Sequence, residues 1–192
     1  MTMAEVCNCV SGSACRCRFP TRRSVAAALA GTAVFPGMMR CAAAAPSEPD
    51  DERFMRIALE EARRADFPFG AVIVREGRLI ARGRNLGRTK DDPTAHGEMV
   101  AIHRGLAAHG SKALRGATLY TTGEPCAMCM GAILWCHFGR LVFAASVDQL
   151  ATRLDQIMIS SAELASKAPF APISITGGVL ADEAMALFPP RK

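Results

Sequence analysis

A long apolar run is absent from this sequence. No stretch approaches the roughly 18 consecutive apolar residues that a membrane-spanning helix needs, so we expect no membrane span. Disorder over the whole length is excluded as well, because 50% of the 192 residues are hydrophobic and 21% are charged. A chain of this length has room for one domain with a substantial core and little room for two.

A surplus of basic residues is also missing from most of the chain. The formal net charge is +5, but residues 1–45 contribute five arginines against one acid, Glu5. Residues 46–192 hold 18 basic and 17 acidic side chains. Proteins that bind phosphate backbones usually carry a basic surplus in the folded part. We therefore do not expect nucleic acid to be the partner.

Cysteine is scarce after residue 45. Three of the eight cysteines lie there, which is too few for a small fold built on disulfides. These three are Cys126, Cys129 and Cys136. The other five are Cys7, Cys9, Cys15, Cys17 and Cys41, and we have no physical account of the first four.

Residues 1–45 are interpreted as a targeting segment. A basic stretch ends in Arg22-Arg23, a mildly apolar, alanine-rich run follows to Phe35, and small residues occupy 42–45. This order resembles a twin-arginine export signal and predicts a periplasmic or secreted protein. An organellar transit peptide, or a disordered leader on a cytoplasmic protein, is the alternative.

From residue 46 on, the sequence predicts alternating strands and helices. Apolar residues recur at helical spacing over 54–62, and short β-rich runs flank the turn Glu76-Gly77. Thr94 is expected to cap the following helix. The predicted helices are 54–62, 95–109, 125–137, 148–167 and 182–187, and the predicted strands are 69–74, 79–83, 117–122, 140–145 and 173–175. This alternation predicts an α/β fold around one mixed five-stranded sheet.

Two short motifs carry the chemistry: His96-Gly97-Glu98 and Pro125-Cys126-Ala127-Met128-Cys129. Cysteines three positions apart share a helix face and can point two thiolates at one metal ion, and Pro125 suits the first helical turn. With His96 as the third ligand, the set leaves one tetrahedral position to water, as a catalytic zinc site requires. We predict one Zn²⁺ per chain, held by His96, Cys126 and Cys129.

Glu98 is the predicted catalytic residue. Residues two apart in a regular helix do not face each other, so His96 and Glu98 share one site only if His96 lies at the helix end, where Pro93 places it. Zinc lowers the pKa of its water toward roughly 7, and Glu98 can take that proton and pass it to a leaving amine. These roles describe hydrolytic deamination. A zinc-stabilised binding module without turnover is the alternative from another class, and such a module has no use for Glu98.

The pattern H-x-E followed by P-C-x-x-C resembles the signature of zinc-dependent nucleobase deaminases. The likeness extends to residues 68–73, 92–96, 118–120 and 124–129, which are similar to the branch that holds guanine deaminases and tRNA adenosine deaminases. It covers about residues 52–188. Gly97 stands where that branch commonly has alanine.

The resemblance implies a three-layer α/β/α sandwich of the cytidine deaminase type, usually a homodimer, with residues 46–192 as the deaminase domain. It makes Asn85 a substrate-binding residue. Trp135 is the second substrate-binding candidate, although core packing accounts for a helical tryptophan equally well. Guanine deaminases also grip the base with an acidic residue near the C-terminus, and the sequence assigns that role to neither Asp155 nor Asp182.

The predicted function is the hydrolytic removal of ammonia from an amino-purine base or nucleoside, with a guanine-like substrate favoured. The near-neutral charge of residues 46–192 and the predicted export both favour a small substrate over cytosolic tRNA. Asp92-Pro93-Thr94, together with Trp135, also looks closer to guanine deaminases. A tRNA-specific adenosine deaminase and a deaminase of cytosine or another nucleoside are the alternatives.

Overall fold

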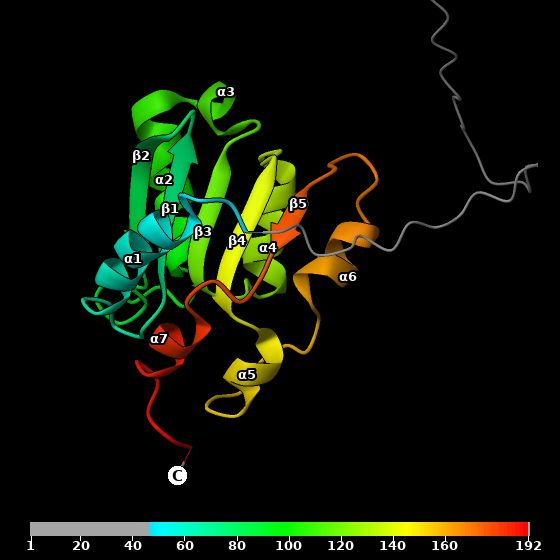
Figure 1. Cartoon of the computed structure of the whole chain (residues 1–192). Helices are drawn as coiled ribbons and strands as arrows, with labels where there is room; N and C mark the ends of the chain where they lie inside the picture. The colour runs from blue at the N-terminus through cyan, green and yellow to red at the C-terminus, as the bar shows by residue number, and fades with distance from the viewer. Residues whose placement is uncertain (1–46, 192) are drawn as a thin grey trace, which may run out of the picture. The chain divides into compact units, whose positions relative to one another are not determined.

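The structure, a computed structural model, describes residues 47–191. The predicted export signal lies outside the described residues and stays a prediction. Five strands form a sheet in the order β2-β1-β3-β4-β5 (Figure 1). They are β1 (Gly70–Arg75), β2 (Arg78–Arg84), β3 (Thr118–Gly123), β4 (Arg140–Ala145) and β5 (Ser174–Thr176).

Seven helices are described alongside the sheet, and none within residues 47–191 is long and apolar enough to cross a membrane. They are α1 (Asp51–Ala62), α2 (Gly97–His109), α3 (Ser111–Leu114), α4 (Ala127–Trp135), α5 (Val147–Ala151), α6 (Ser161–Ser166) and α7 (Ala181–Met185).

The sheet is mixed, as predicted. β1 runs antiparallel to both of its neighbours, β2 and β3, whereas β4 runs parallel to both β3 and β5. A parallel pair needs a crossover connection, and α4 provides it between β3 and β4. The start of α4 therefore follows the carboxyl end of β3, at the edge of the sheet where ligands bind in open α/β folds.

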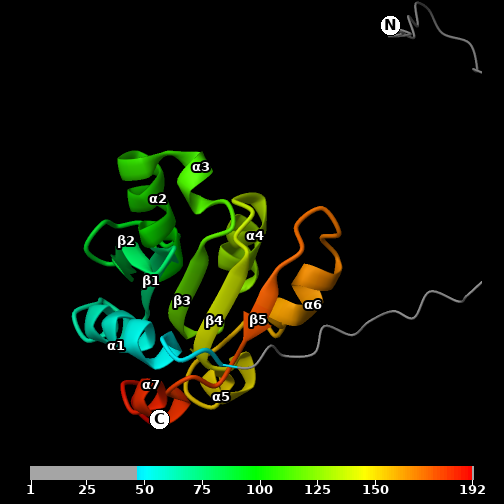
Figure 2. The ribbon, with the colours of Figure 1, turned by 45° about the horizontal axis from the view of Figure 1, so that its top comes forward.

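Successive strand residues point to opposite faces and build two separate cores. In β1, Ala71 and Ile73 pack in the core that includes residues of α2 and α4, whereas Val72 and Val74 pack in the core that includes residues of α1 and α7. Figures 1 and 2 show these two pairs of helices on opposite faces of the sheet. The three-layer α/β/α sandwich is confirmed.

The predicted hairpin between the first two strands is confirmed. Glu76 and Gly77 form the two-residue turn, with φ angles of 50° and 70°. Positive φ at both central positions is the type I′ geometry, whose twist matches that of the flanking strands.

The prediction of one helix over 148–167 is wrong. The structure has two short helices there, α5 and α6, separated by residues 152–160. Ser160 ends the non-helical stretch, because its side chain accepts a hydrogen bond from the N–H of Glu163 and starts a new helix. Serine followed three residues later by glutamate is the sequence signature of such a start.

Two helix starts also differ from the prediction. α2 begins at Gly97, so its N-cap is His96 and Thr94 lies two residues too early to cap it. The hydroxyl and N–H of Thr94 instead donate to the Asp92 carboxylate, at 2.6 and 2.8 Å. α4 begins at Ala127, so Pro125 precedes the helix and does not lie in its first turn.

A buried ion pair joins α1 to the sheet. The carboxylate of Asp51 accepts two hydrogen bonds from Arg140, at 2.6 and 2.8 Å, and one from the Tyr120 hydroxyl at 3.0 Å. Burial alone would raise the pKa of Asp51, but the hydrogen bonds from Arg140, the Glu48 N–H and Tyr120 hold that pKa below its usual value. The charged form of Asp51 therefore stabilises the fold.

We predict that Asp51→Asn lowers the free energy of unfolding by roughly 3 kcal/mol at pH 7, because it removes the buried negative charge that accepts two hydrogen bonds from Arg140. The folded pKa of Asp51 lies below the unfolded value of about 4, so the stabilisation is complete above that pH and declines as the pH falls further. Urea unfolding at pH 7 and pH 3 measures both effects. The control is Asp50→Asn, whose exposed partner Arg53 is 3.5 Å away, with an expected change within about 0.5 kcal/mol. Equal effects of the two variants would contradict the prediction.

Candidate active site

Both chemical motifs lie at helix starts. His96 is the N-cap of α2 and Cys126 is the N-cap of α4, and both have extended backbone. The unpaired N–H groups and the dipole at a helix start favour thiolates and developing anions. A Cβ at Gly97 would lie 2.9 Å from the carbonyl oxygen of Phe69. Glycine in place of alanine therefore lets the start of α2 pack closely against the chain leading into β1.

His96, Cys126 and Cys129 converge with the geometry of a metal site. The Nδ1 atom of His96 lies 3.7 Å from the sulfur of Cys126 and 3.6 Å from that of Cys129, and the three ligand atoms all lie within 4.8 Å of one another. A tetrahedral zinc with ordinary Zn–N and Zn–S bonds requires N···S separations of about 3.6 Å. The three residues therefore fit a zinc ion without rearrangement.

The thiol of Cys126 is poised to ionise. Hydrogen bonds with Cys129 and His96 lower its pKa to about 4, against the opposing effect of burial. The same contact with Cys126 raises the pKa of His96. A thiolate is the form of cysteine that binds metal, and Cys126 has this form at neutral pH.

Glu98 lies beside the three ligands in the first turn of α2. It is 3% exposed, and its Oε1 atom accepts a hydrogen bond from the Thr121 hydroxyl at 3.1 Å. Burial raises the pKa of this carboxyl group above its usual value. A buried carboxylate that binds a proton readily, placed next to a metal site, is suited to general acid and base catalysis.

The site opens into a cavity of about 620 Å³. Ligand pockets commonly measure roughly 300–1,000 Å³, so a nucleobase with its sugar can be accommodated. The walls come from the starts of α2 and α4, from two loops before α2, and from the segment between α5 and α6. The lining residues are Phe67, Phe69, Asn85, Gly87, Arg88, Asp91, Asp92, Pro93, His96, Glu98, Glu124, Cys126, Leu154, Asp155, Gln156 and Ile157.

Asn85 lines this cavity, as its predicted role requires. It is 5% exposed and directly follows β2. Its Oδ1 atom accepts the N–H of Gly87 at 3.1 Å, which fixes the orientation of the side-chain amide. The structure thus brings Asn85 together with the metal ligands and Glu98.

Trp135 does not line the cavity, and its predicted substrate-binding role is wrong for the site of its own chain. It is the last residue of α4, about 13 Å along the helix axis from Cys126 at 1.5 Å per residue. Its side chain is 73% exposed and its ring centroid lies 4.9 Å from that of Phe170. The other interpretation of Trp135, packing in the core, is wrong too, because the side chain is exposed.

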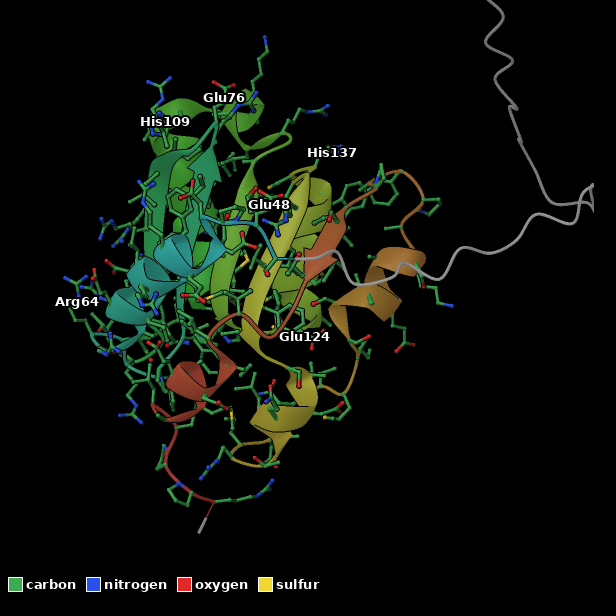
Figure 3. The ribbon with its side chains drawn as sticks, viewed as in Figure 1. Glu48, Arg64, Glu76, His109, Glu124 and His137 are labelled. Atoms are coloured by element: carbon green, nitrogen blue, oxygen red, sulfur yellow. The ribbon has the colours of Figure 1, made fainter. Side chains whose placement is uncertain are left out.

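Glu124 is a structural anchor that the sequence motif did not reveal. Its carboxylate is buried and accepts the N–H of Val147 at 2.9 Å and that of Ser161 at 2.7 Å. These N–H groups open α5 and α6, beside which Glu124 lies in Figure 3. Glu124, the residue before Pro125, therefore binds both ends of segment 147–161. This segment supplies one wall of the cavity.

Several cavity residues were not predicted because they come from loops without a motif. Phe67 and Arg88 lie on two different loops, and the guanidinium carbon of Arg88 is 4.6 Å from the centroid of the Phe67 ring. Asp155 also lines the cavity, whereas Asp182 does not. The structure therefore distinguishes between the two acids that the sequence left unassigned.

A sequence model of the cytidine and deoxycytidylate deaminase zinc-binding region matches residues 48–145, which is half of the chain. The chain belongs to this deaminase family. The family is zinc-dependent, and the ligand geometry of His96, Cys126 and Cys129 agrees with that membership. The deaminase is therefore a zinc enzyme with a cytidine-deaminase-like fold.

The relatives include tRNA adenosine deaminases and guanine deaminases. The tRNA-specific adenosine deaminase of Bacillus subtilis is 43% identical over 99 residues, covering 50% of this chain and 62% of that protein. A structure from work on A-to-I editing by tRNA:A34 deaminases is 34% identical, with a TM-score of 0.61, over 71% of this chain and 99% of that one. The guanine deaminase of Nitrosomonas europaea is 28% identical, with a TM-score of 0.63, over 76% of this chain and 83% of that one. The deaminase spans less than two thirds of the length of the curated relatives it matches.

We predict that Cys126→Ala abolishes zinc binding and lowers the melting temperature, because loss of one ligand removes folding free energy that the metal supplies. Cys136→Ala is the matched control, since Cys136 is the C-cap of the same helix and lies outside the ligand group. Metal analysis of the purified proteins should find one zinc per chain in the wild type and in the control. Full zinc content in Cys126→Ala would show that this cysteine is not a ligand.

A second prediction concerns the wall held by Glu124. Ser161→Pro removes the N–H that Glu124 accepts, at a position where proline is tolerated: residue 161 opens α6 and Ser160 has the extended backbone that precedes proline. We expect KM for ammonia release to rise several-fold with zinc content unchanged. Ser160→Ala removes the cap of α6 but keeps the Glu124 bond. If both variants raise KM equally, helix stability and not the Glu124 anchor controls this wall.

Proposed function

We propose that the deaminase removes the exocyclic amino group of a purine ring by hydrolysis, exchanging a C–N bond for a C–O bond and releasing ammonia. The observation that carries this proposal is the buried Glu98 carboxylate beside the three ligands at the base of the cavity. Burying a carboxylate costs desolvation free energy. A zinc-stabilised module without turnover would gain nothing from a buried carboxylate that is not a zinc ligand.

The residues divide the work as follows. When bound by His96, Cys126 and Cys129, zinc supplies a water of lowered pKa. Glu98 accepts a proton at its carboxylate and donates it to the leaving amine. Asn85 binds a polar edge of the base, and the N–H groups at the start of α4 face the anion that develops during attack.

Adenosine in tRNA is the leading candidate substrate. It is supported by the curated relatives, among which tRNA adenosine deaminases from several bacteria reach 41–46% identity over about half of this chain. The expectation that nucleic acid is not a partner therefore loses its support. That expectation rested on an average over residues 46–192, and an average hides any local concentration of charge.

A free guanine-like base is the second candidate. One observation favours it: Asp155 lines the cavity together with Gln156, where its carboxylate is 92% exposed and paired with Arg191 at 2.6 Å. The resemblance to guanine deaminases calls for an acidic residue from the C-terminal part of the chain at this place. A carboxylate can accept hydrogen bonds from the N–H groups that guanine carries and adenine lacks, and such pairing discriminates by as much as roughly 10⁴-fold.

The deciding experiment compares ammonia release from an anticodon stem-loop RNA with adenosine at the wobble position, from guanine, adenine and cytosine, and from their nucleosides. We expect the RNA adenosine to have the highest kcat/KM. Faster turnover of free guanine would replace the first candidate by the second, and no release from any substrate would overturn the proposed function.

Glu98→Gln is the control for every substrate in this panel. It should retain one zinc per chain and lose about 100-fold or more of kcat, because it cannot accept or donate the proton. Unchanged turnover would remove Glu98 from the mechanism. The predicted homodimer and the predicted export are separate proposals that a gel-filtration measurement and a fractionation of the native host would test.

A further inference from the structure

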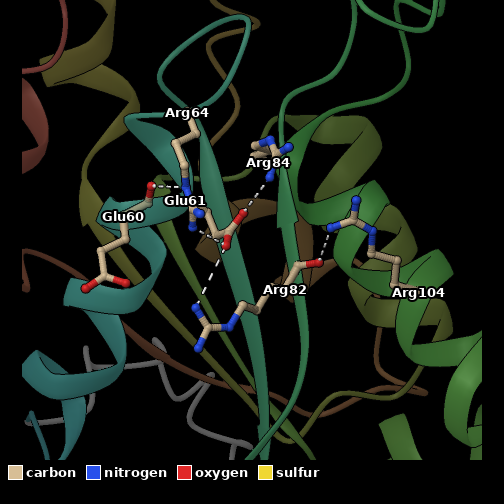
Figure 4. A network of polar contacts seen from close by, with 6 residues as sticks. All are labelled: Glu60, Glu61, Arg64, Arg82, Arg84 and Arg104. Carbon is tan, nitrogen blue, oxygen red and sulfur yellow. Dashed lines mark hydrogen bonds and ion pairs between the residues drawn. The ribbon is translucent and has the colours of Figure 1, made fainter.

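Four arginines from three elements lie around the open edge of β2. Figure 4 shows three of them, Arg64, Arg82 and Arg84, around Glu61, with Arg104 bonded to the backbone of Arg82. We call this group the arginine surface. It consists of Arg64 just after α1, Arg82 and Arg84 on β2, and Arg104 on α2.

One buried carboxylate organises this group. Glu61 lies 2.7 Å from Arg64, 3.2 Å from Arg84 and 3.9 Å from Arg82. The side chain of Glu61 is 5% exposed, whereas those of Arg64 and Arg82 are 58% and 44% exposed. A single carboxylate thus holds three guanidinium groups in place while it balances the charge of one. The excess positive charge faces the solvent, as the outward direction of Arg64 in Figure 3 illustrates.

Ordinary stabilisation of a helix end explains only part of the arginine surface. Cations near a helix C-terminus interact favourably with its dipole, which accounts for Arg64. It does not account for Arg82, Arg84 and Arg104, which come from other elements. Arg104 donates to the carbonyl oxygen of Arg82 at 3.0 Å, and so adds a charge at the open strand edge.

The charges of the described chain are unevenly distributed. Residues 47–191 hold 17 basic and 17 acidic side chains. The arginine surface brings four positive charges together with two negative ones, from Glu60 and Glu61. The remainder of the described chain therefore has a negative balance, and the arginine surface is where a polyanion is attracted.

The arginine surface adjoins one wall of the active-site cavity. Arg84 directly precedes Asn85, which lines the cavity. The loop that follows Arg64 contributes Phe67 to the same wall, and it is joined to the strand end by the N–H of Asp66, which donates to the carbonyl oxygen of Asn85 at 3.0 Å. Arg88, stacked on Phe67, lines the cavity itself, next to the acidic Asp91 and Asp92.

We propose that the arginine surface binds the phosphate backbone of the RNA whose adenosine enters the cavity. Guanidinium groups match phosphate with paired N–H donors, and groups held in place before binding lose little entropy when it occurs. This inference rests on the proposed function only for the choice of RNA as the polyanion. The experiment below separates binding of RNA from turnover.

The test uses the full-length, zinc-loaded protein and a fluorescent anticodon stem-loop RNA. The variant Arg64→Gln/Arg82→Gln/Arg104→Gln keeps Arg84 as the partner of Glu61. The matched control is Arg53→Gln/Arg56→Gln/Arg115→Gln, which removes the same charge from exposed arginines elsewhere. Kd is measured by fluorescence anisotropy over a series of salt concentrations.

We expect Kd for RNA to rise about 10-fold or more in the test variant at 0.1 M salt, and the slope of log K against log salt to decrease by about 2. The control variant should change both Kd and the salt slope by less than the test variant does. Ammonia release from free purines should stay within two-fold of the wild type. If melting shows that the test variant is destabilised, Arg104→Gln alone leaves the ion pairs of Glu61 in place and should still lower the slope by about 0.7.

Equal effects of the two triple variants, or an unchanged salt slope in the test variant, would overturn the proposal. So would a wild type that deaminates free purines but shows no salt-dependent RNA binding, and the deaminase function would then still stand. A wild type that binds RNA through these arginines without deaminating it would also overturn the proposal, because the bound RNA would not be the substrate, and it would remove tRNA as the leading candidate.

Discussion

The site depends on one constraint, which is that the starts of α2 and α4 must meet at the same end of the sheet. The two helices pack on one face of the sheet and share its core. His96 is thereby brought within 3.7 Å of two cysteines that lie 30 and 33 residues further along the chain. Because the ligands are a helix N-cap, a second N-cap and a residue of the first helical turn, any shift of either helix would separate them.

Four acidic side chains are buried in residues 47–191, and their partners differ in a way that matches their roles. Asp51 and Glu61 are paired with arginines, and Glu124 accepts two backbone N–H groups. These contacts hold a fixed negative charge in place. Glu98 instead accepts a side-chain hydrogen bond from the Thr121 hydroxyl, and burial raises its pKa. Of the four, Glu98 is the one whose surroundings suit the transfer of a proton.

The strands, the hairpin and the metal site could be predicted because their signals are local. The β-rich runs on either side of the turn residues Glu76-Gly77, and the spacing within the H-x-E and P-C-x-x-C motifs, each depend on residues close together in sequence. The capping signature at Ser160 is equally local, and it divides the stretch 148–167 that helical composition alone predicts as one helix.

The remaining features depend on contacts between distant segments. The outward position of Trp135 follows from the length and direction of α4, which spacing to Cys129 cannot reveal. The anchor at Glu124 joins residues 23 and 37 positions away. The arginine surface combines side chains from α1, β2 and α2, so a charge count along the chain does not reveal it.

The central claim is that the three-ligand site, once it holds zinc, is where a purine loses its amino group. It is tested most directly by titrating metal-free protein with Zn²⁺ while ammonia release from its best purine substrate is measured. The account predicts no release without metal, and a linear rise that stops at one zinc per chain. Release by the metal-free protein, or a plateau at a different stoichiometry, would contradict it.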